Sequence, residues 1–513
     1  MKKNLRTVVL LMLMSISLQL SAQRYLSEVF TSTTVTSNVV YGQNYSTLLS
    51  PVSLFMDQLK ADVYQPVGDV LTARPTVFVV HPGSAFPIFY NTWCTGIKTD
   101  SAVAEMCRQF ARRGYTAIAM SYRAGWNPVS TDQDTRTGSL LQALGRGIQD
   151  LKACVRFFRN NALTTNTYNI DPNLFILGGL NTGGTLALNY ATLQNYSQIQ
   201  IFKLLSATNN SVYRFTSGVT YFDSTHWGNF DGYGGNPSLN YSGNTPGVSN
   251  DVQFVFSLSG ALGDSAWLTA GEVPIVSFHN ITDITNPYFC GSIFSIGQFV
   301  VDVCGAHMVI GNSNTFQNNS AFQNNSWTDV YTTTANQRNG GSGYDGLYPF
   351  TTGTPQSSPW EWWDSTTVYQ IMINGLGFTT GRADTVWYNS KSDNPDMSPA
   401  KGRAYIDTIM GYLNPRIYRA IGLNVGIQAM ASYEESVSIY PNPATDQFTI
   451  DIAEGGDAIR NLHVYDLTGR LVRSFENVNR QLFSVQTKSF DAGVYVLKIG
   501  FEKGEVIRKI TVH

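Results

Sequence analysis

Apolar and polar positions alternate along most of the chain in a pattern typical of parallel strands linked by helices. PTVFVVHPG, from Pro75, is an apolar run that ends in a loop, and SAVAEMCRQFARRG, from Ser101, has apolar residues at helical spacing before Gly114. YTAIAMSYR predicts the next strand, RGIQDLKACVRFF a helix, and NLFILGGLNTGGTLALNYA a strand, a glycine-rich turn and a helix. This alternation predicts a single α/β domain over residues 23–424.

Two segments interrupt the alternation. Residues 207–250 are rich in Gly, Asn and aromatic residues, and we expect them to form a cap over the sheet. Residues 312–343 are low in complexity and repeat the sequence FQNNS, which predicts an exposed loop that buries little apolar area.

The pattern changes near the C-terminus. A stretch beginning at Ser398 has apolar residues at helical spacing and predicts the closing helix of the large domain. Residues 425–435 form a linker. Residues 436–513 contain short alternating strands separated by turns, which is the pattern of a small immunoglobulin-like β-sandwich.

The N-terminus predicts export. Lys2, Lys3 and Arg6 precede an apolar run over residues 8–20 and the small residues Ser21 and Ala22. This order is typical of a secretory signal peptide over residues 1–22. The apolar run is shorter than the roughly 20 residues that span a bilayer, so we expect no transmembrane anchor in the mature chain.

Composition narrows the function classes. Charged residues make up 14% of the chain and the formal net charge is -2, so no basic field favours nucleic acid. Of five cysteines, Cys94 with Cys107 and Cys290 with Cys304 are possible disulfides, although the sequence leaves the connectivity open. Cys154 falls inside a predicted helix as a buried thiol. No cysteine or histidine spacing indicates a metal site, and no cofactor is expected.

The C-terminal stretch resembles the type A sorting domains of the type IX secretion system. The resemblance is carried by Tyr440-Pro441-Asn442-Pro443-Ala444, Asp466-Leu467-Thr468-Gly469-Arg470, Gly493-Val494-Tyr495 and the basic end around Lys509. It implies that the type IX machinery is a partner and that the protein is secreted or delivered to the cell surface. A generic immunoglobulin-like binding module is the alternative.

The large domain resembles the carboxylesterase and lipase branch of the α/β-hydrolases. DVYQP from Asp62, HPGSAF from His81, FARRGYTAIAMSYR from Phe110, LGGLNTGG from Leu177 and PIVSFHNITD ending at Asp283 follow the family's order. The resemblance implies an α/β-hydrolase fold whose mostly parallel sheet is flanked by helices. It also implies a nucleophile on the Gly-x-x-x-Gly turn that follows the central strand.

That turn contains Asn181 where the chemistry needs a serine. An amide nitrogen is delocalised into its carbonyl, so a histidine cannot activate it as it activates a hydroxyl. Thr182 carries a hydroxyl one residue beyond the tip. For the oxyanion loop the resemblance implies N–H groups from Gly83, Ser84 and Thr182, whereas Pro82 has none to donate.

The other triad positions are also incomplete. Asp283 stands at the position of the acid, but the loop that resembles the base loop, GLYPFTTGTPQSSPWEWWD, contains no histidine. His307 is the remaining base candidate, in a context that predicts a strand edge. Within the aromatic insertion, Trp227 and Tyr233 are expected to line a pocket for a small molecule, ester or glycan.

Three hypotheses follow for this chain. The favoured one is an exported, catalytically degenerate hydrolase that binds a ligand. The second is an active carboxylic-ester hydrolase with an atypical site, for example Thr182 with His307. The third is a structural or adhesive surface protein.

Overall fold

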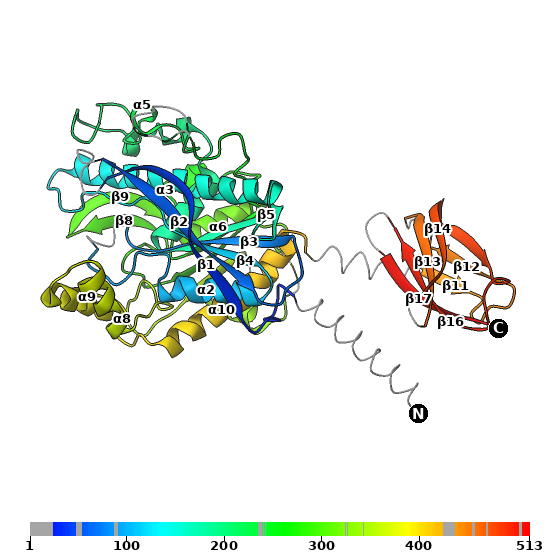
Figure 1. Cartoon of the computed structure of the whole chain (residues 1–513). Helices are drawn as coiled ribbons and strands as arrows, with labels where there is room; N and C mark the ends of the chain where they lie inside the picture. Colours follow the sequence, from blue (N-terminus) through cyan, green and yellow to red (C-terminus); the bar gives the residue numbers. More distant parts are fainter. Residues whose placement is uncertain are drawn as a thin grey trace. The chain divides into compact units, whose positions relative to one another are not determined.

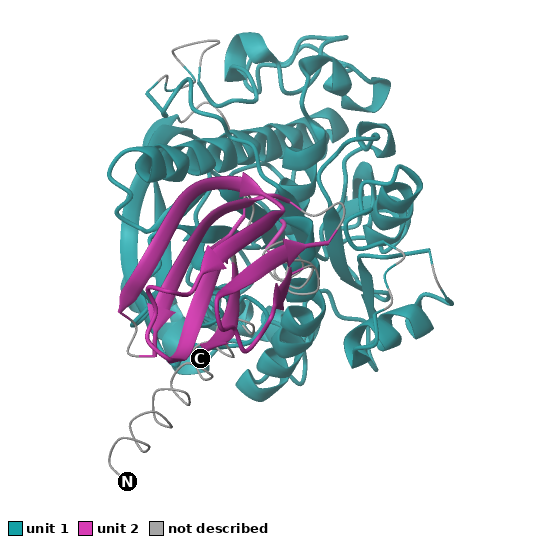
Figure 2. Ribbon diagram, turned by 90° about the vertical axis from the view of Figure 1, so that its right-hand side faces the viewer, with its two compact units in different colours: residues 1–421 teal, residues 422–513 magenta. Residues whose placement is uncertain are grey.

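The computed structural model describes the chain in two compact units, residues 1–421 and 422–513 (Figure 2). The described residues are 24–47, 54–86, 91–233, 239, 241, 243–323, 325, 327–341, 343–423, 437–453, 457–467, 470–501 and 505–513. The predicted signal peptide and the predicted linker lie outside the described residues.

Unit 1 is built on an eight-stranded sheet with the order β1-β2-β4-β3-β5-β6-β7-β10 (Figure 1). Its strands are β1 (Thr33–Ser46), β2 (Phe55–Pro66), β3 (Arg74–Val80), β4 (Thr116–Met120), β5 (Ile170–Leu180), β6 (Phe254–Leu258), β7 (Ile275–Asn280) and β10 (Leu347–Phe350). In this spatial order, the neighbouring strands β4, β3, β5, β6, β7 and β10 pair in parallel. Strand β2 pairs antiparallel with β1 and β4. The predicted α/β fold class is confirmed.

Helices cover both faces of this sheet. They are α2 (Ser101–Arg112), α3 (Gln133–Leu163), α4 (Thr182–Thr192), α6 (Ala306–Thr315), α7 (Val330–Arg338) and α10 (Pro399–Ala420). Helix α5 (Ser224–Trp227) belongs to the aromatic insertion, and α8 (Ser365–Tyr369) packs against α9 (Thr380–Asp393). Figure 1 shows α3 on one side of the sheet and α2 with α10 on the other. Because both faces are covered, every residue of β3, β4, β6 and β7 is buried, which explains their continuous apolar runs.

The predicted helix boundaries follow local signals. Helix α2 is followed by Gly114 with a φ of 99°, the left-handed conformation that commonly ends a helix. The closing helix α10 begins after Ser398, whose side chain accepts a hydrogen bond from the backbone N–H of Lys401. Both predictions are confirmed.

The aromatic insertion covers helix α3, not the sheet as predicted. Gln142 donates hydrogen bonds from its side chain to the carbonyl oxygens of Tyr213 and Tyr221. Gly138 and Gly145 on α3 leave room for aromatic rings, since a Cβ at Gly145 would lie 2.3 Å from the ring of Phe222. The docking surface is therefore the outer side of α3 (Figure 1).

The low-complexity stretch is not the exposed loop that its composition predicts. It contains the end of α6 and all of α7, and Phe322 is fully buried. Asn319 accepts a hydrogen bond from the Ile275 backbone N–H and donates to the Ile275 and Asp345 carbonyl oxygens. A buried asparagine with satisfied hydrogen bonds can join a core, which corrects the prediction.

The structure agrees with the predicted cysteine pairing only in part. Cys290 and Cys304 form a disulfide between β8 (Cys290–Ser295) and β9 (Gln298–Cys304), a separate hairpin. Cys94 and Cys107 are free and buried, so a disulfide between them was wrong. Cys154 is a buried free thiol of α3, as predicted.

Unit 2 is a β-sandwich with its own core. Its strands are β11 (Val437–Tyr440), β12 (Gln447–Ile452), β13 (Ile459–Asp466), β14 (Leu471–Arg480), β15 (Leu482–Gln486), β16 (Gly493–Gly500) and β17 (Glu505–Val512). They form two antiparallel sheets with the orders β11-β12-β15 and β14-β13-β16-β17. Phe448, Leu462 and Leu497 are fully buried members of one cluster drawn from both sheets.

The separate cores of the two units generate a prediction about truncation. A chain lacking residues 437–513 should fold and should keep the unfolding midpoint that unit 1 has in the full-length protein, because the core of unit 1 is drawn from its own residues. Calorimetry of the truncated and full-length chains measures this. Aggregation of the truncated chain, or loss of its cooperative transition, would contradict it.

Candidate functional site

The turn between β5 and α4 has the geometry of a nucleophile elbow. Asn181 has φ 46° and ψ -109°, a conformation that is rare for a residue with a side chain. Its N–H donates to the Leu258 carbonyl oxygen at 2.7 Å, and its carbonyl oxygen accepts from the Thr185 N–H at 2.8 Å. The strained turn that exposes the nucleophile in hydrolases is therefore present around an asparagine.

Two glycines make this turn possible. A Cβ at Gly179 would lie 2.4 Å from the carbonyl carbon of Gly183, and a Cβ at Gly183 would lie 2.2 Å from the Val80 carbonyl oxygen. In both cases the nearest atom belongs to the backbone, which cannot move aside without displacing β3 or α4. The glycines of the motif are therefore explained by the turn itself, whatever residue occupies its tip.

Ser358 contacts the side chain of Asn181. The Ser358 hydroxyl donates a hydrogen bond to Asn181 Oδ1 at 3.0 Å, across a sequence separation of 177 residues. Ser358 belongs to the loop that resembles the base loop of the hydrolases. Asn181 and Ser358 therefore form a hydrogen-bonded pair in which neither side chain is a base that can take a proton at neutral pH.

The base loop is fixed on several sides. Ser259 donates from its hydroxyl to the Ser357 carbonyl oxygen at 3.1 Å, and Asn280 donates from its side chain to the Gln356 carbonyl oxygen at 2.6 Å. Asn394, beyond α9, donates to the carbonyl oxygens of Ser358 and Glu361. Ser358 is therefore held against Asn181 by contacts from separate parts of the domain.

Asp283, the predicted acid, makes its contacts elsewhere. Its Oδ1 accepts hydrogen bonds from the backbone N–H groups of Thr285 and Asn286, which closes a turn after β7. Its Oδ2 lies 3.4 Å from Nε2 of His279, and both side chains are fully buried. The imidazole nearest Asp283 is therefore on the strand before it, not on the base loop.

His307, the predicted base, lies among aromatic rings. It is the second residue of α6, which corrects the predicted strand edge. Its backbone N–H donates a hydrogen bond to the Tyr288 carbonyl oxygen. Its ring centroid is 4.7 Å from that of Phe289 and 4.6 Å from that of Tyr344. Burial lowers its pKa. No imidazole among the described residues hydrogen bonds to Asn181, Ser358 or Thr182.

The predicted oxyanion loop is tightly turned. Gly83 has φ 123° and Ser84 has φ 53°. The Ser84 carbonyl oxygen accepts a hydrogen bond from Trp126 Nε1 at 2.8 Å. The preceding His81 stacks on Tyr122 at a centroid distance of 4.5 Å, and burial lowers its pKa to about 4, so it is neutral. The donor roles of Gly83, Ser84 and Thr182 stay predictions.

Two buried carboxyl groups are electrostatically coupled near this loop. Asp100 accepts hydrogen bonds from Thr95 Oγ1 and from the Gly96 and Ile97 N–H groups, and burial raises its pKa to about 7. Burial, and secondarily the charge of Asp100, raise the pKa of Glu361 well above its usual range. Sequence reasoning missed this pair because Asp100 and Glu361 are far apart in the chain.

Trp227 and Tyr233, the predicted ligand contacts of the insertion, each lie beside an arginine side chain of α3. Trp227 is buried, and the Arg146 guanidinium lies 4.9 Å from the centroid of its indole ring. Tyr233 lies under Arg156, at 4.8 Å from its ring centroid. These rings pack against arginine side chains of α3, and their role as ligand contacts stays a prediction.

Comparison with known proteins now identifies the two units. Residues 61–222 match the BD-FAE family, and residues 438–513 match the secretion system C-terminal sorting domain. The chain combines an esterase-like α/β-hydrolase domain with a type IX sorting domain. The BD-FAE match contains the predicted oxyanion loop and the turn around Asn181. The sorting domain directs the protein through type IX secretion to the cell surface or the medium.

Solved structures similar to this chain include an esterase. Esterase 2 of Thermogutta terrifontis phosphorylated by paraoxon has 13% identity and a TM-score of 0.33, covering 67% of this chain and 95% of that one. Its propionate-bound form has 13% identity and a TM-score of 0.30, covering 63% and 92%. Its butyrate-bound form has 14% identity and a TM-score of 0.32, covering 63% and 91%. No curated protein matches the chain.

Within the described residues, no group of three or more His, Cys, Asp or Glu side chains is placed to hold a metal ion. Among the described helices, none combines the length and the apolar character needed to cross a membrane.

The carboxyl pair generates a prediction about pH. A folded pKa near 7 for Asp100, against 3.8 in the unfolded chain, means that the folded state retains a proton that the unfolded state releases. The associated stability is complete below about pH 4 and is lost as the pH rises through 7. At about 1.4 kcal/mol per pKa unit, the loss amounts to a few kcal/mol.

Asp100→Asn should remove this part of the pH dependence. Urea unfolding at intervals between pH 4 and pH 8 measures it, with Asp171→Asn as the control carboxylate outside the pair. The difference in stability between wild type and Asp100→Asn should change steadily over this range. A constant difference would contradict the prediction.

Proposed function

We propose that the α/β-hydrolase domain is a catalytically silent esterase homologue that acts outside the cell as a ligand-binding protein. The observation that carries the proposal is the Asn181–Ser358 hydrogen bond at the tip of an intact elbow. The backbone that holds a nucleophile is present, while the two side chains at the nucleophile and base positions cannot perform acyl transfer.

The chemistry fails at two steps. Attack on an ester carbonyl needs an electron pair that the nucleophile can share, and the Asn181 amide nitrogen shares its pair with its own carbonyl. A hydroxyl at this position would still need a base to take its proton, and Ser358 offers a hydroxyl of similar acidity. The turn could bind a carbonyl compound through backbone N–H groups without cleaving it.

The alternative of an atypical active esterase needs Thr182 and His307 to act together. His307 packs between Phe289 and Tyr344, and its backbone is tied to Tyr288. The Thr182 side chain is within hydrogen-bonding range of the buried Tyr122. These separate surroundings favour the silent site. Export by the sorting domain is common to both readings, because it depends on unit 2.

Turnover of p-nitrophenyl acetate and butyrate tests this proposal. Wild type should be inactive above the uncatalysed rate, and Asn181→Ser should show only a small residual rate. Asn181→Ser combined with Ser358→His should gain about 100-fold over the single variant, the lower end of what general-base catalysis contributes, because Asp283 is engaged elsewhere.

The matched controls are Thr182→Val and His307→Gln. Neither should change the rate measured for wild type. Robust turnover by the wild type that either control abolishes would show that the chain is an active esterase with an atypical site.

A further inference from the structure

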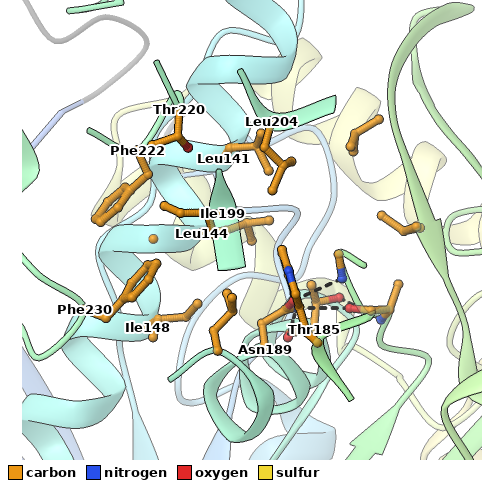
Figure 3. Close-up of a pocket in the computed structure, with 17 residues that line it drawn as sticks. Leu141, Leu144, Ile148, Thr185, Asn189, Ile199, Leu204, Thr220, Phe222 and Phe230 are labelled. Atoms are coloured by element: carbon orange, nitrogen blue, oxygen red, sulfur yellow. Dashed lines mark hydrogen bonds between the residues drawn. The ribbon is translucent and has the colours of Figure 1, made fainter. Parts of the chain in front are cut away.

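An apolar cavity of ≈ 70 Å³ lies behind the elbow helix, between α3, α4 and the insertion (Figure 3). Leu144 and Ile148 line it from α3, Phe222 and Phe230 from the insertion, and Val303 from the β8–β9 hairpin. The volume is several times the ~10–15 Å³ that one water needs. The cavity is therefore large enough for a small organic group.

The polar residues of the wall have little to offer a water. Thr185 Oγ1 accepts a hydrogen bond from the Ala261 N–H, and Asn189 Oδ1 accepts from the Gly263 N–H. Asn189 Nδ2 donates to the Thr185 and Ala261 carbonyl oxygens. Among the described lining residues, Thr220 contributes the remaining side-chain hydroxyl. A buried water needs two to four partners, so this cavity favours an apolar occupant.

The cavity is separate from the candidate active site. Its lining includes neither Asn181 nor Ser358, and Thr185 reaches it one helical turn beyond the elbow. A ligand in the cavity would therefore contact the side of α4, not the tip of the turn. Ligand binding in the cavity is therefore independent of whether the elbow is catalytically silent.

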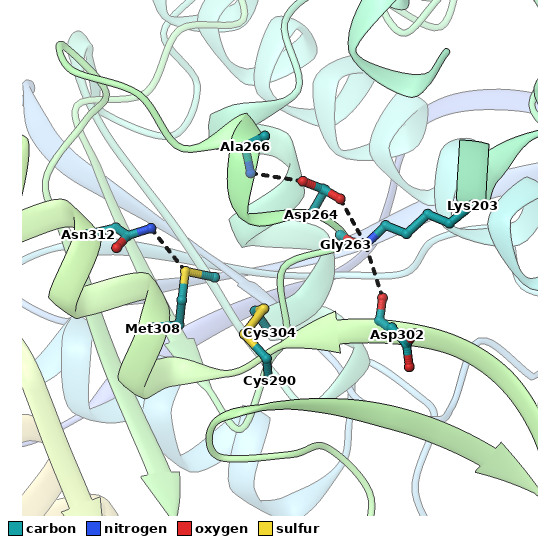
Figure 4. Close-up of a disulfide and its surroundings, with 9 residues drawn as sticks. All are labelled: Lys203, Gly263, Asp264, Ala266, Cys290, Asp302, Cys304, Met308 and Asn312. Carbon is teal, nitrogen blue, oxygen red and sulfur yellow. Dashed lines mark hydrogen bonds and ion pairs between the residues drawn. A yellow bond between two sulfur atoms is a disulfide. The ribbon is translucent and has the colours of Figure 1, made fainter. Parts of the chain in front are cut away.

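Lys203, next to Leu204, contacts two further segments that line the cavity, the loop at Gly263 and strand β9 (Figure 4). Its Nζ donates to the Gly263 carbonyl oxygen at 2.7 Å and to the Asp302 carbonyl oxygen at 3.3 Å, and it lies 2.9 Å from Oδ2 of Asp264. Leu204, Gly263 and the valines on either side of Asp302 all line the cavity.

The hairpin wall has a second tie. Cys304 exchanges backbone hydrogen bonds with Leu262 at 2.8 Å and 2.9 Å, and its disulfide to Cys290 closes the hairpin. The walls are therefore cross-linked without any ligand, which preorganises the cavity and lowers the cost of ordering it on binding.

We propose that this cavity binds the alkyl end of a small uncharged ligand. Burial of one methylene corresponds to about a four-fold gain in affinity, at ~0.8 kcal/mol per CH₂. Affinity should therefore rise about four-fold per carbon from 1-butanol to 1-hexanol. A charged or doubly polar ligand of the same length should bind far more weakly, because the wall cannot pair its polar groups.

Calorimetric titration of the full-length protein with 1-butanol, 1-pentanol and 1-hexanol tests the proposal, with 1,6-hexanediol as the matched polar probe. Ala261→Leu should fill the cavity and reduce hexanol affinity at least ten-fold. Val212→Phe, which adds volume at an exposed site of the insertion, should leave the affinity unchanged.

Crystals of wild type under xenon provide a readout that needs no variant. Xenon density among Leu144, Phe222 and Val303 is the expected result. Absence of xenon there, equal affinity for hexanol and hexanediol, or full hexanol affinity in Ala261→Leu would overturn the proposal. Asn181→Ser should not change hexanol affinity, so failure of the silent-site proposal can be told apart from failure of this one.

Discussion

The close approach of α4 to β3 is the constraint on which the site depends. Gly183 lies so near the Val80 carbonyl oxygen that no side chain fits, and Gly179 lies equally near Gly183. This packing forces the residue between β5 and α4 into a strained conformation at the carboxyl edge of the sheet. The elbow is a product of backbone packing, so its geometry does not depend on which residue occupies its tip.

The side chains at the predicted triad positions do not form a hydrogen-bonded chain like that of a catalytic triad. Ser358 donates a hydrogen bond to Asn181 Oδ1, backbone N–H groups after β7 donate to Asp283 Oδ1, and aromatic rings surround His307. Each predicted triad position is occupied by a group with a structural partner. Restoring one catalytic group would therefore leave the others engaged in their present contacts.

Much of the fold was predictable because its signals are local. The strand–turn–helix around Asn181, the end of α2 at Gly114 and the β-sandwich each depend on residues a few positions apart. The Cys290–Cys304 pair also matches its short separation. Local spacing could not exclude a Cys94–Cys107 disulfide, because the burial of each thiol depends on the tertiary fold.

The remaining features depend on contacts between distant parts of the chain. The partner of Asn181 is 177 residues away, and only the folded base loop selects Ser358 over its neighbour Ser357. The insertion docks on α3 because Gly138 and Gly145 leave space for rings, which periodicity does not reveal. Asn319 appeared solvent-exposed from its polar repeat, yet its amide bridges backbone groups inside the core.

Covalent trapping is the most direct measurement of whether this elbow holds a nucleophile. A fluorophosphonate forms a stable adduct with an activated serine or threonine, and intact-mass spectrometry detects one adduct per chain. An elbow with Asn181 at its tip should give no adduct on the full-length wild type under conditions that label a serine esterase completely. A stoichiometric adduct on Thr182, Ser358 or any other residue of the site would contradict it.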